Sequence, residues 1–145
     1  MGEKLGAETA NIMVVDDDVM NIAVFQAMLT EMNQKSDKAL NGKEALQLVP
    51  ERIEKIRAGE QVQMYTLLLV DYNMPVVDGP QFARMVRKLL VEEGMTIPYI
   101  CCCSAYAEES YKRVATAVGM KQFLTKPVSD DELRKLLVQA GLHQE

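Results

Sequence analysis

Residues 12–18 read IMVVDDD and residues 67–75 read LLLVDYNMP, so an apolar run ends abruptly in aspartate twice in this chain. A short and continuously apolar run suits a strand covered on both faces, as the strands of parallel sheets are. The acids then lie where each strand reaches solvent. Two buried strands that both end in carboxylates predict a parallel sheet with a polar carboxyl edge.

Strand-like and helix-like segments alternate along the rest of the sequence. The helical segments carry apolar residues at spacings of three and four, which places those residues on one face. Asn41 and the stretch Ser129-Asp130-Asp131-Glu132 are typical of helix N-termini. Pro50 is expected to kink or split its helix, because proline lacks an N–H and its ring clashes with the preceding turn. The expected strands cover 11–15, 36–40, 66–71, 98–104 and 122–125, and the expected helices cover 19–33, 42–57, 79–93, 108–118 and the segment after Ser129.

Five strands, each followed by a helix, imply a doubly wound α/β domain with helices on both faces of a parallel sheet and right-handed crossovers. The length of 145 residues fits one domain that needs no disulfide or metal to be stable. Residues 1–10 show no periodicity and are interpreted as a tail or linker, and residues 11–142 as the domain.

Composition and charge exclude several classes of function. The net charge is −5 and no cluster of Lys and Arg forms a basic stripe, so direct nucleic-acid binding is not expected. The apolar runs are far shorter than the roughly 20 residues that span a bilayer, and no signal-peptide pattern is present. We expect a cytoplasmic protein without membrane contact.

The three cysteines stand together in YICCCSAYA, residues 99–107. An odd count argues against a secreted disulfide framework, and zinc sites usually need spaced cysteine pairs with further ligands. The one histidine, His143, is two residues from the end. We therefore expect Cys101, Cys102 and Cys103 to be small apolar residues of a buried strand, facing alternate layers of helices.

Ligands of doubly wound folds bind beyond the carboxyl ends of the strands, near the point where the strand order reverses. Carboxylates crowded at such an edge repel one another unless one is protonated or a cation lies among them, and Mg²⁺ prefers such oxygen ligands. A carboxylate there can attack an activated phosphoryl group and form an acyl phosphate, with lysine and hydroxyl groups contacting the phosphate oxygens. The residues expected at this edge are Asp16, Asp17, Asp18, Asp71, Ser104 and Lys126.

Each of these residues also has an ordinary explanation. An acid after a buried strand is often a helix cap or a solvated loop residue, and this holds for Asp18 in particular. Ser104 alone would be a polar strand end, and Lys126 alone a surface lysine before a rigid turn at Pro127. Their occurrence together, in order at the ends of four strands, favours a common site.

The motifs IMVVDDD, LLLVDYNMPVVDG, CSA and FLTKPV occur in this order, and over residues 11–141 the sequence resembles the receiver domain of two-component response regulators and hybrid histidine kinases. The resemblance implies a flavodoxin-like sheet of strand order 2-1-3-4-5. It implies a signalling receiver rather than an enzyme with a separate substrate, one that catalyses only its own phosphorylation and dephosphorylation. The long segment between residues 51 and 64, and Asn21, are most similar to hybrid-kinase receivers.

The resemblance also assigns roles to single residues. Asp71 would accept a phosphoryl group from a phosphohistidine, and Lys126 would bind that phosphate. Asp17, Asp71 and the backbone carbonyl of Asn73 would ligate Mg²⁺, with Asp16 acting mainly through water and Mn²⁺ able to substitute. The remaining roles are the switch hydroxyl (Ser104), the aromatic gate (Phe123) and a proline preceded by a cis bond (Pro127).

Partners and output follow from the same resemblance. The phosphodonor would be a histidine kinase or a histidine phosphotransfer domain, and further domains of the same polypeptide are possible partners. Phosphorylation would draw Ser104 inward, let Phe123 swing into the vacated space, and change the surface formed by residues 108–118, 122–125 and the last helix. Phe123 stands where the family commonly has tyrosine, so the gate lacks a hydroxyl.

Two other functions remain open on the residues alone. One is a Mg²⁺-dependent phosphohydrolase with an aspartyl-phosphate intermediate, although the haloacid-dehalogenase pattern needs a second acid where this chain has Asn73. The other is a receiver-like binding module that no longer takes phosphate. The complete set of acid, hydroxyl and lysine groups argues against this module.

Overall fold

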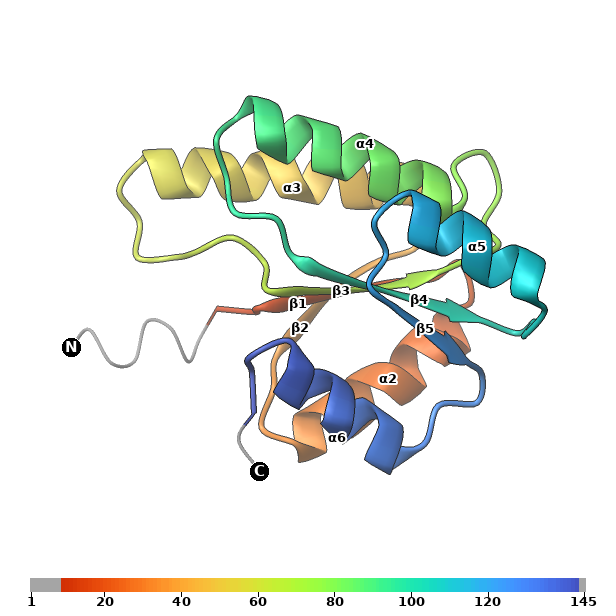
Figure 1. Ribbon diagram of the computed structural model, residues 1–145. Coiled ribbons are helices and arrows are strands. Elements are labelled where there is room, and N and C mark those ends of the chain that lie inside the picture. Colours follow the sequence, from red (N-terminus) through yellow and green to blue (C-terminus); the bar gives the residue numbers. More distant parts are fainter. Residues whose placement is uncertain (1–8, 144–145) are drawn as a thin grey trace.

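The computed structural model describes residues 9–143, so most of the tail predicted at residues 1–10 lies outside the described residues. Five parallel strands form one sheet in the order β2-β1-β3-β4-β5, which confirms the predicted topology (Figure 1). The strands are β1 (Ile12–Val15), β2 (Ser36–Ala39), β3 (Leu67–Asp71), β4 (Tyr99–Ser104) and β5 (Gln122–Thr125). The helices are α2 (Val19–Glu31), α3 (Gly42–Arg57), α4 (Gly79–Glu92), α5 (Glu109–Ala117) and α6 (Asp130–Gln139).

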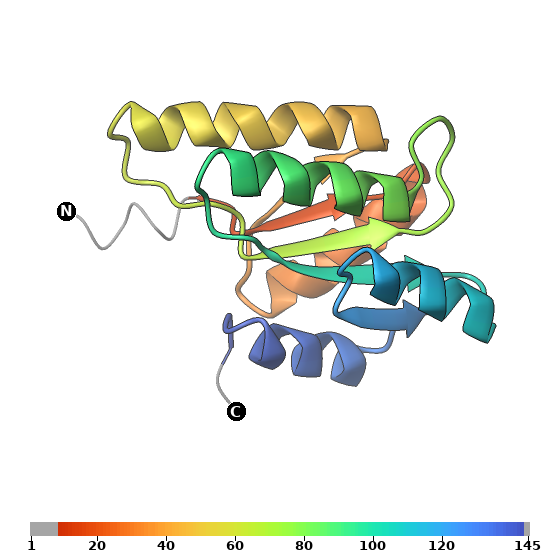
Figure 2. The same cartoon turned by 45° about the horizontal axis from the view of Figure 1, so that its top comes forward.

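Helices cover both faces of the sheet: α3, α4 and α5 lie on one side and α2 and α6 on the other (Figure 1), and Figure 2 shows α3 and α4 side by side. β1 and β3 are buried along their whole length, as their continuous apolar runs predict. Their side chains alternate between two separate cores: Met13, Leu68 and Val70 face α3 and α4, whereas Ile12 and Leu69 face α2 and α6. The alternating faces of a strand thus build two layers from one apolar run.

Helix ends follow the capping signals of the sequence. The side chain of Asn41 accepts a hydrogen bond from the Glu44 N–H at the start of α3. Ser129 and Glu132 form the predicted capping box of α6. Asp18 accepts from the Met20 N–H and caps α2, so the ordinary explanation of this third aspartate is confirmed.

Of the two effects predicted for Pro50, a kink or a split, the split is wrong, because α3 runs without a break from Gly42 to Arg57. Pro50 lies on the exposed side of α3, whereas Val49 and Ile53 are buried against the sheet. Packing of the buried face outweighs the loss of one hydrogen bond on the solvent side.

The cysteines occupy the middle of β4 and are free thiols. Cys102 packs in the core beneath α3 and α4, and Cys101 and Cys103 pack in the core beneath α2 and α6, as predicted. Burial, together with the negative charge of neighbouring groups, raises the pKa of the Cys102 thiol. A protonated, buried thiol is unreactive, so these side chains serve as packing groups.

Among the described helices, none combines the length and apolar character that crossing a membrane requires.

Candidate functional site

Three aspartates meet at the carboxyl edge of the sheet, at the strand ends that the sequence indicates. Asp16 and Asp17 follow β1, and Asp71 is the last residue of the neighbouring strand β3. Each of the three contributes a carboxylate oxygen to a cluster in which these atoms lie within 4.8 Å of one another. Asp16 is 2% exposed and Asp71 is 8% exposed, whereas Asp17 faces solvent.

Lys126 joins two of these acids from the end of β5. Its Nζ lies 2.7 Å from Asp16 Oδ2 and 3.1 Å from Asp71 Oδ1. Burial lowers the pKa of Lys126, but its hydrogen bond to Asp16 and the charge of Asp71 outweigh this effect and raise the pKa overall. Lys126 is therefore a cation, and it is fixed between two carboxylates. The peptide bond between Lys126 and Pro127 is cis, as predicted.

The pKa of Asp71 is raised above its ordinary value. Burial is the largest cause, and the charge of Asp16 adds to it, so the pKa of Asp71 rises to about 6 although Lys126 opposes the rise. One ammonium group does not balance three carboxylates. The cluster is thus short of positive charge, which is the property expected of a site for a cation.

The donor set suits Mg²⁺ or a similar hard cation, which takes carboxylate and carbonyl oxygens. The carboxylates of Asp16, Asp17 and Asp71 converge from two adjacent strand ends. Asn73 is exposed two residues after Asp71, in the loop between β3 and α4, so its backbone is within the same edge of the fold. The residues present therefore fit the predicted ion.

Ser104 ends β4, the strand next to β3, and is completely buried. Its Oγ accepts a hydrogen bond of 3.0 Å from the backbone N–H of Tyr106, and its carbonyl accepts one of 2.8 Å from the Lys126 N–H. The carboxyl edge thus holds the predicted acids, hydroxyl and ammonium on β1, β3, β4 and β5.

The family model of the response regulator receiver domain matches residues 12–138. The chain belongs to this family of receiver domains. The resemblance of the sequence motifs is thereby confirmed, and the receiver domain is a signalling module of two-component and phosphorelay systems.

Known receiver-containing proteins and structures support this assignment. The chain is 28% identical over 136 residues to the sensor histidine kinase GacS of Pseudomonas protegens, covering 94% of this chain and 14% of that protein. It is 33% identical over 132 residues to the osmosensing histidine protein kinase SLN1 of Saccharomyces cerevisiae, covering 90% of this chain and 10% of that protein. This receiver domain therefore spans only a small part of the length of these kinases.

A solved structure extends the comparison to three dimensions. The receiver domain of the histidine kinase CKI1 from Arabidopsis thaliana, complexed with Mg²⁺ and BeF₃⁻, matches with a TM-score of 0.77 and 26% identity, over 94% of each chain. That receiver domain was thus crystallised with the ion and a fluoride complex.

Phe123 of this receiver domain stands apart from the acids. It is half-buried in β5, paired in register with Cys102, and packs against the core beneath α3 and α4. The Nζ of Lys112 lies 5.9 Å from its ring centroid. The structure therefore places the predicted gate residue beside α5 rather than in the acidic cluster.

Two features of the receiver domain were missed by sequence reasoning. At Gly79, a Cβ atom would collide with the backbone carbonyl oxygen of Asp71, so the first residue of α4 must be glycine for the helix to approach this strand end. The other feature is a chain of three contacting tyrosine rings: Tyr72, Tyr111 and Tyr106. The glycine of the motif VVDG could have indicated a close backbone approach at this position. No sequence pattern predicts that tyrosines far apart in the chain are in contact.

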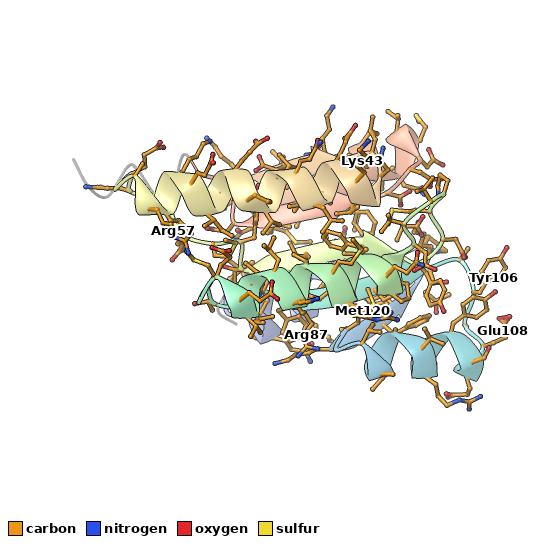
Figure 3. All side chains as sticks on the ribbon, turned by 90° about the horizontal axis from the view of Figure 1, so that it is seen from above. Lys43, Arg57, Arg87, Tyr106, Glu108 and Met120 are labelled. Carbon is orange, nitrogen blue, oxygen red and sulfur yellow. The ribbon has the colours of Figure 1, made fainter. Side chains whose placement is uncertain are left out.

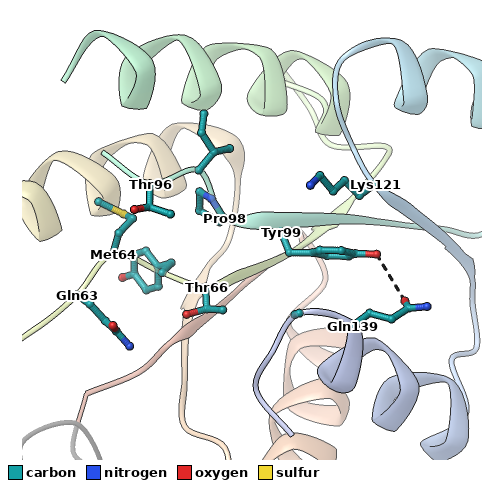
Figure 4. Close-up of a pocket in the computed structure, with 11 residues that line it drawn as sticks. Gln63, Met64, Thr66, Thr96, Pro98, Tyr99, Lys121 and Gln139 are labelled. Atoms are coloured by element: carbon teal, nitrogen blue, oxygen red, sulfur yellow. Dashed lines mark hydrogen bonds between the residues drawn. The ribbon is translucent and has the colours of Figure 1, made fainter. Parts of the chain in front are cut away.

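The cavity in Figure 4 lies at the other end of the sheet and is not part of this site. Its volume is about 310 Å³, and its walls include Thr66, which precedes β3, and Tyr99, which begins β4. The Tyr99 hydroxyl donates a 3.5 Å hydrogen bond to Gln139 of α6. The chemistry-bearing groups of the receiver domain are at the carboxyl edge instead.

Proposed function

We propose that this receiver domain, residues 11–142, transfers a phosphoryl group from a phosphohistidine to Asp71. Mg²⁺ would be held by the carboxylates of Asp17 and Asp71 and the backbone carbonyl of Asn73, with Asp16 nearby. The observation that supports this most directly is the position of Lys126, whose ammonium bonds to both Asp16 and Asp71 inside a cluster of three carboxylates. Once a bound cation offsets the carboxylates, the ammonium of Lys126 is in position to pair with a phosphoryl oxygen on Asp71.

The chemistry at Asp71 is a nucleophilic displacement. A carboxylate oxygen of Asp71 forms a bond to phosphorus while the bond between phosphorus and the histidine nitrogen breaks. The electron pair of that bond goes to the imidazole, which takes up a proton, and Asp71 becomes an acyl phosphate. A bound Mg²⁺ supplies positive charge next to the phosphoryl oxygens during this transfer.

Two further residues contact the product in this proposal. Lys126 pairs with one phosphoryl oxygen, because its Nζ is already 3.1 Å from Asp71 Oδ1. The hydroxyl of Ser104 turns toward another oxygen, and its loop moves with it. Phe123 then occupies the vacated space, and the surface of α5, β5 and α6 changes as the signal output.

The first experiment is incubation with acetyl phosphate and Mg²⁺, followed by intact-protein mass spectrometry. We expect the wild type to gain one phosphoryl group and the Asp71→Asn variant to gain none, because the amide is not a nucleophile. Chelation of the metal should prevent the gain. A wild type that gains no phosphoryl mass would refute the proposal, and sustained turnover of a phosphomonoester would favour a phosphohydrolase instead.

We infer a docking surface for the phosphohistidine donor on α2. Met20 and Val24 are 69% and 56% exposed, and Ala27 continues their row at helical spacing. This apolar row begins next to Asp17 and Asp18, at the end of α2 that borders the acidic cluster. A partner that places its phosphohistidine above Asp71 therefore has an apolar contact beside it.

Met20→Glu should slow transfer from a phosphohistidine donor by about tenfold or more, because it puts a charge into the apolar contact. Phosphorylation by acetyl phosphate needs no docking and should change by less than about twofold. Met85→Glu, on exposed residue Met85 of α4, is the matched control and should affect neither rate. If Met20→Glu slowed phosphorylation equally with the phosphohistidine donor and with acetyl phosphate, Met20 would affect the phosphoryl transfer itself and not the docking of the donor.

Cys102→Ala should lower the free energy of unfolding by about 1 kcal/mol, because it leaves a small cavity in a core where Cys102 is completely buried. Its rate of phosphorylation by acetyl phosphate should stay within about twofold of the wild type. Urea denaturation and the mass-spectrometric assay measure the two effects. A large loss of phosphorylation with unchanged stability would contradict the packing role of the cysteines.

A further inference from the structure

Three of the five tyrosines form a continuous contact beside the acidic site. The ring of Tyr111, in the first turn of α5, contacts the ring of Tyr72 in a T-shaped arrangement, at a centroid distance of 4.8 Å and an interplanar angle of 77°. On its other side Tyr111 stacks with Tyr106 at 5.4 Å and 15°. Figure 3 shows Tyr106 near Glu108, at the start of α5.

Tyr106, at one end of this tyrosine chain, is hydrogen-bonded to Ser104, the predicted switch residue. The backbone N–H of Tyr106 donates the hydrogen bond that Ser104 Oγ accepts, so the ring and the hydroxyl belong to one short loop after β4. Tyr106 is 48% exposed, and its stacking therefore contributes little to the core. Because the stacked ring and the N–H belong to the same residue, the loop cannot move without disturbing the stack.

The other end of the chain is attached to the sheet. The N–H of Tyr72 donates to the Cys103 carbonyl at 2.9 Å, and the Tyr72 carbonyl accepts from the Gly79 N–H at 2.8 Å. Tyr72 is therefore held between β4 and α4, and its ring holds Tyr111. If Tyr111 followed a moving Tyr106, it would lose its contact with Tyr72.

We propose that Tyr106 and Tyr111 are positioning residues that hold Ser104 in the place it has in this structure and oppose its movement toward a phosphoryl group on Asp71. The inference rests on the proposed function, because it assumes that Ser104 moves. Any displacement of the loop costs at least one of the two ring contacts, since Tyr111 is bound on both sides. The tyrosine chain thus sets the fraction of molecules in which Ser104 has moved toward Asp71.

The test uses beryllofluoride with saturating Mg²⁺ as a phosphoryl mimic and measures its apparent dissociation constant by fluorine NMR. Tyr106→Ala removes the stack, and this variant should bind the mimic about threefold to tenfold more tightly. This range corresponds to the interaction free energy of one aromatic pair. Tyr111→Leu should act in the same direction. Tyr106→Phe keeps the ring and is the matched control, with unchanged affinity.

Repeating the measurement in a Ser104→Ala protein distinguishes the positioning of Ser104 by the tyrosines from a general effect on packing. In a Ser104→Ala protein the hydroxyl is absent, so adding Tyr106→Ala should leave the affinity for beryllofluoride unchanged. An equal gain in both backgrounds, or no gain with Ser104 present, would overturn the role of the tyrosines and leave the proposed function standing. A wild type that binds no beryllofluoride would overturn both.

Discussion

Replacing Asp71 with asparagine should stabilise the metal-free protein at pH 7 by about 1–3 kcal/mol, although it removes the proposed phosphoacceptor. The reason is the raised pKa of Asp71, about 6, which burial and the neighbouring charge of Asp16 produce. A carboxylate that is harder to ionise in the folded protein than in the unfolded chain opposes folding once it is charged. Asparagine keeps the shape and carries no charge.

The stability difference between Asp71→Asn and the wild type should depend on pH. Because the folded-state pKa lies above the unfolded value, the favourable contribution of protonated Asp71 is complete below about pH 4 and is lost as the pH rises through about 6. The advantage of Asp71→Asn should therefore be absent at low pH and complete above pH 6. Urea denaturation in the presence of a chelator measures it across this range.

Asp18→Asn is the matched control for the same substitution. Asp18 is exposed, and asparagine is an equally good N-cap, so the stability of Asp18→Asn should be close to that of the wild type at pH 7. Added Mg²⁺ should stabilise the wild type more than Asp71→Asn and narrow the gap, because the ion binds only the complete cluster well. An Asp71→Asn protein that is less stable than the wild type at pH 7 without metal would contradict the raised pKa.

Replacing Lys126 with methionine should have the opposite effect on stability, a loss of about 3 kcal/mol in the metal-free protein at pH 7. Methionine keeps much of the length of the side chain but removes the cation that lies 2.7 Å from Asp16 and 3.1 Å from Asp71. Asp16 is 2% exposed, so its charge would then be buried without a cation beside it, although its Oδ1 would still accept the hydrogen bond from the Asp18 N–H. Phosphorylation by acetyl phosphate should slow by about a hundredfold or more, because the phosphoryl oxygens lose their positive partner.

The controls for Lys126 come from the same chain. Lys135→Met, on the exposed side of α6, should change neither stability nor rate appreciably. Adding Asp71→Asn to Lys126→Met should recover part of the lost stability, because it removes one of the two carboxylates that have lost their cation. If Lys126→Met and Lys135→Met proved equally stable, the ion pairs of Lys126 would not contribute to the free energy of unfolding.

Much of the candidate site could be predicted from the sequence because its residues stand at strand ends. Once β1, β3, β4 and β5 are recognised as parallel, the residues that follow them must share one edge, and this brought together Asp16, Asp71, Ser104 and Lys126. Pro50 shows the limit of local rules, since packing of the opposite helix face overrode the expected break. The glycine of VVDG signalled a special position at Gly79, but its close contact with Asp71 depends on how α4 enters the edge and needed the tertiary structure.

The sequence by itself determined the order of elements, the burial of β1 and β3 on both faces and the identity of the acids, because these depend on apolar periodicity and on residues adjacent in the chain. Only the tertiary structure decided that Lys126 bridges Asp16 and Asp71, 110 and 55 positions away. It also decided that Tyr72, Tyr106 and Tyr111 join into one chain of rings. Such contacts depend on side-chain directions and on the distance between separate strand ends, which no local pattern encodes.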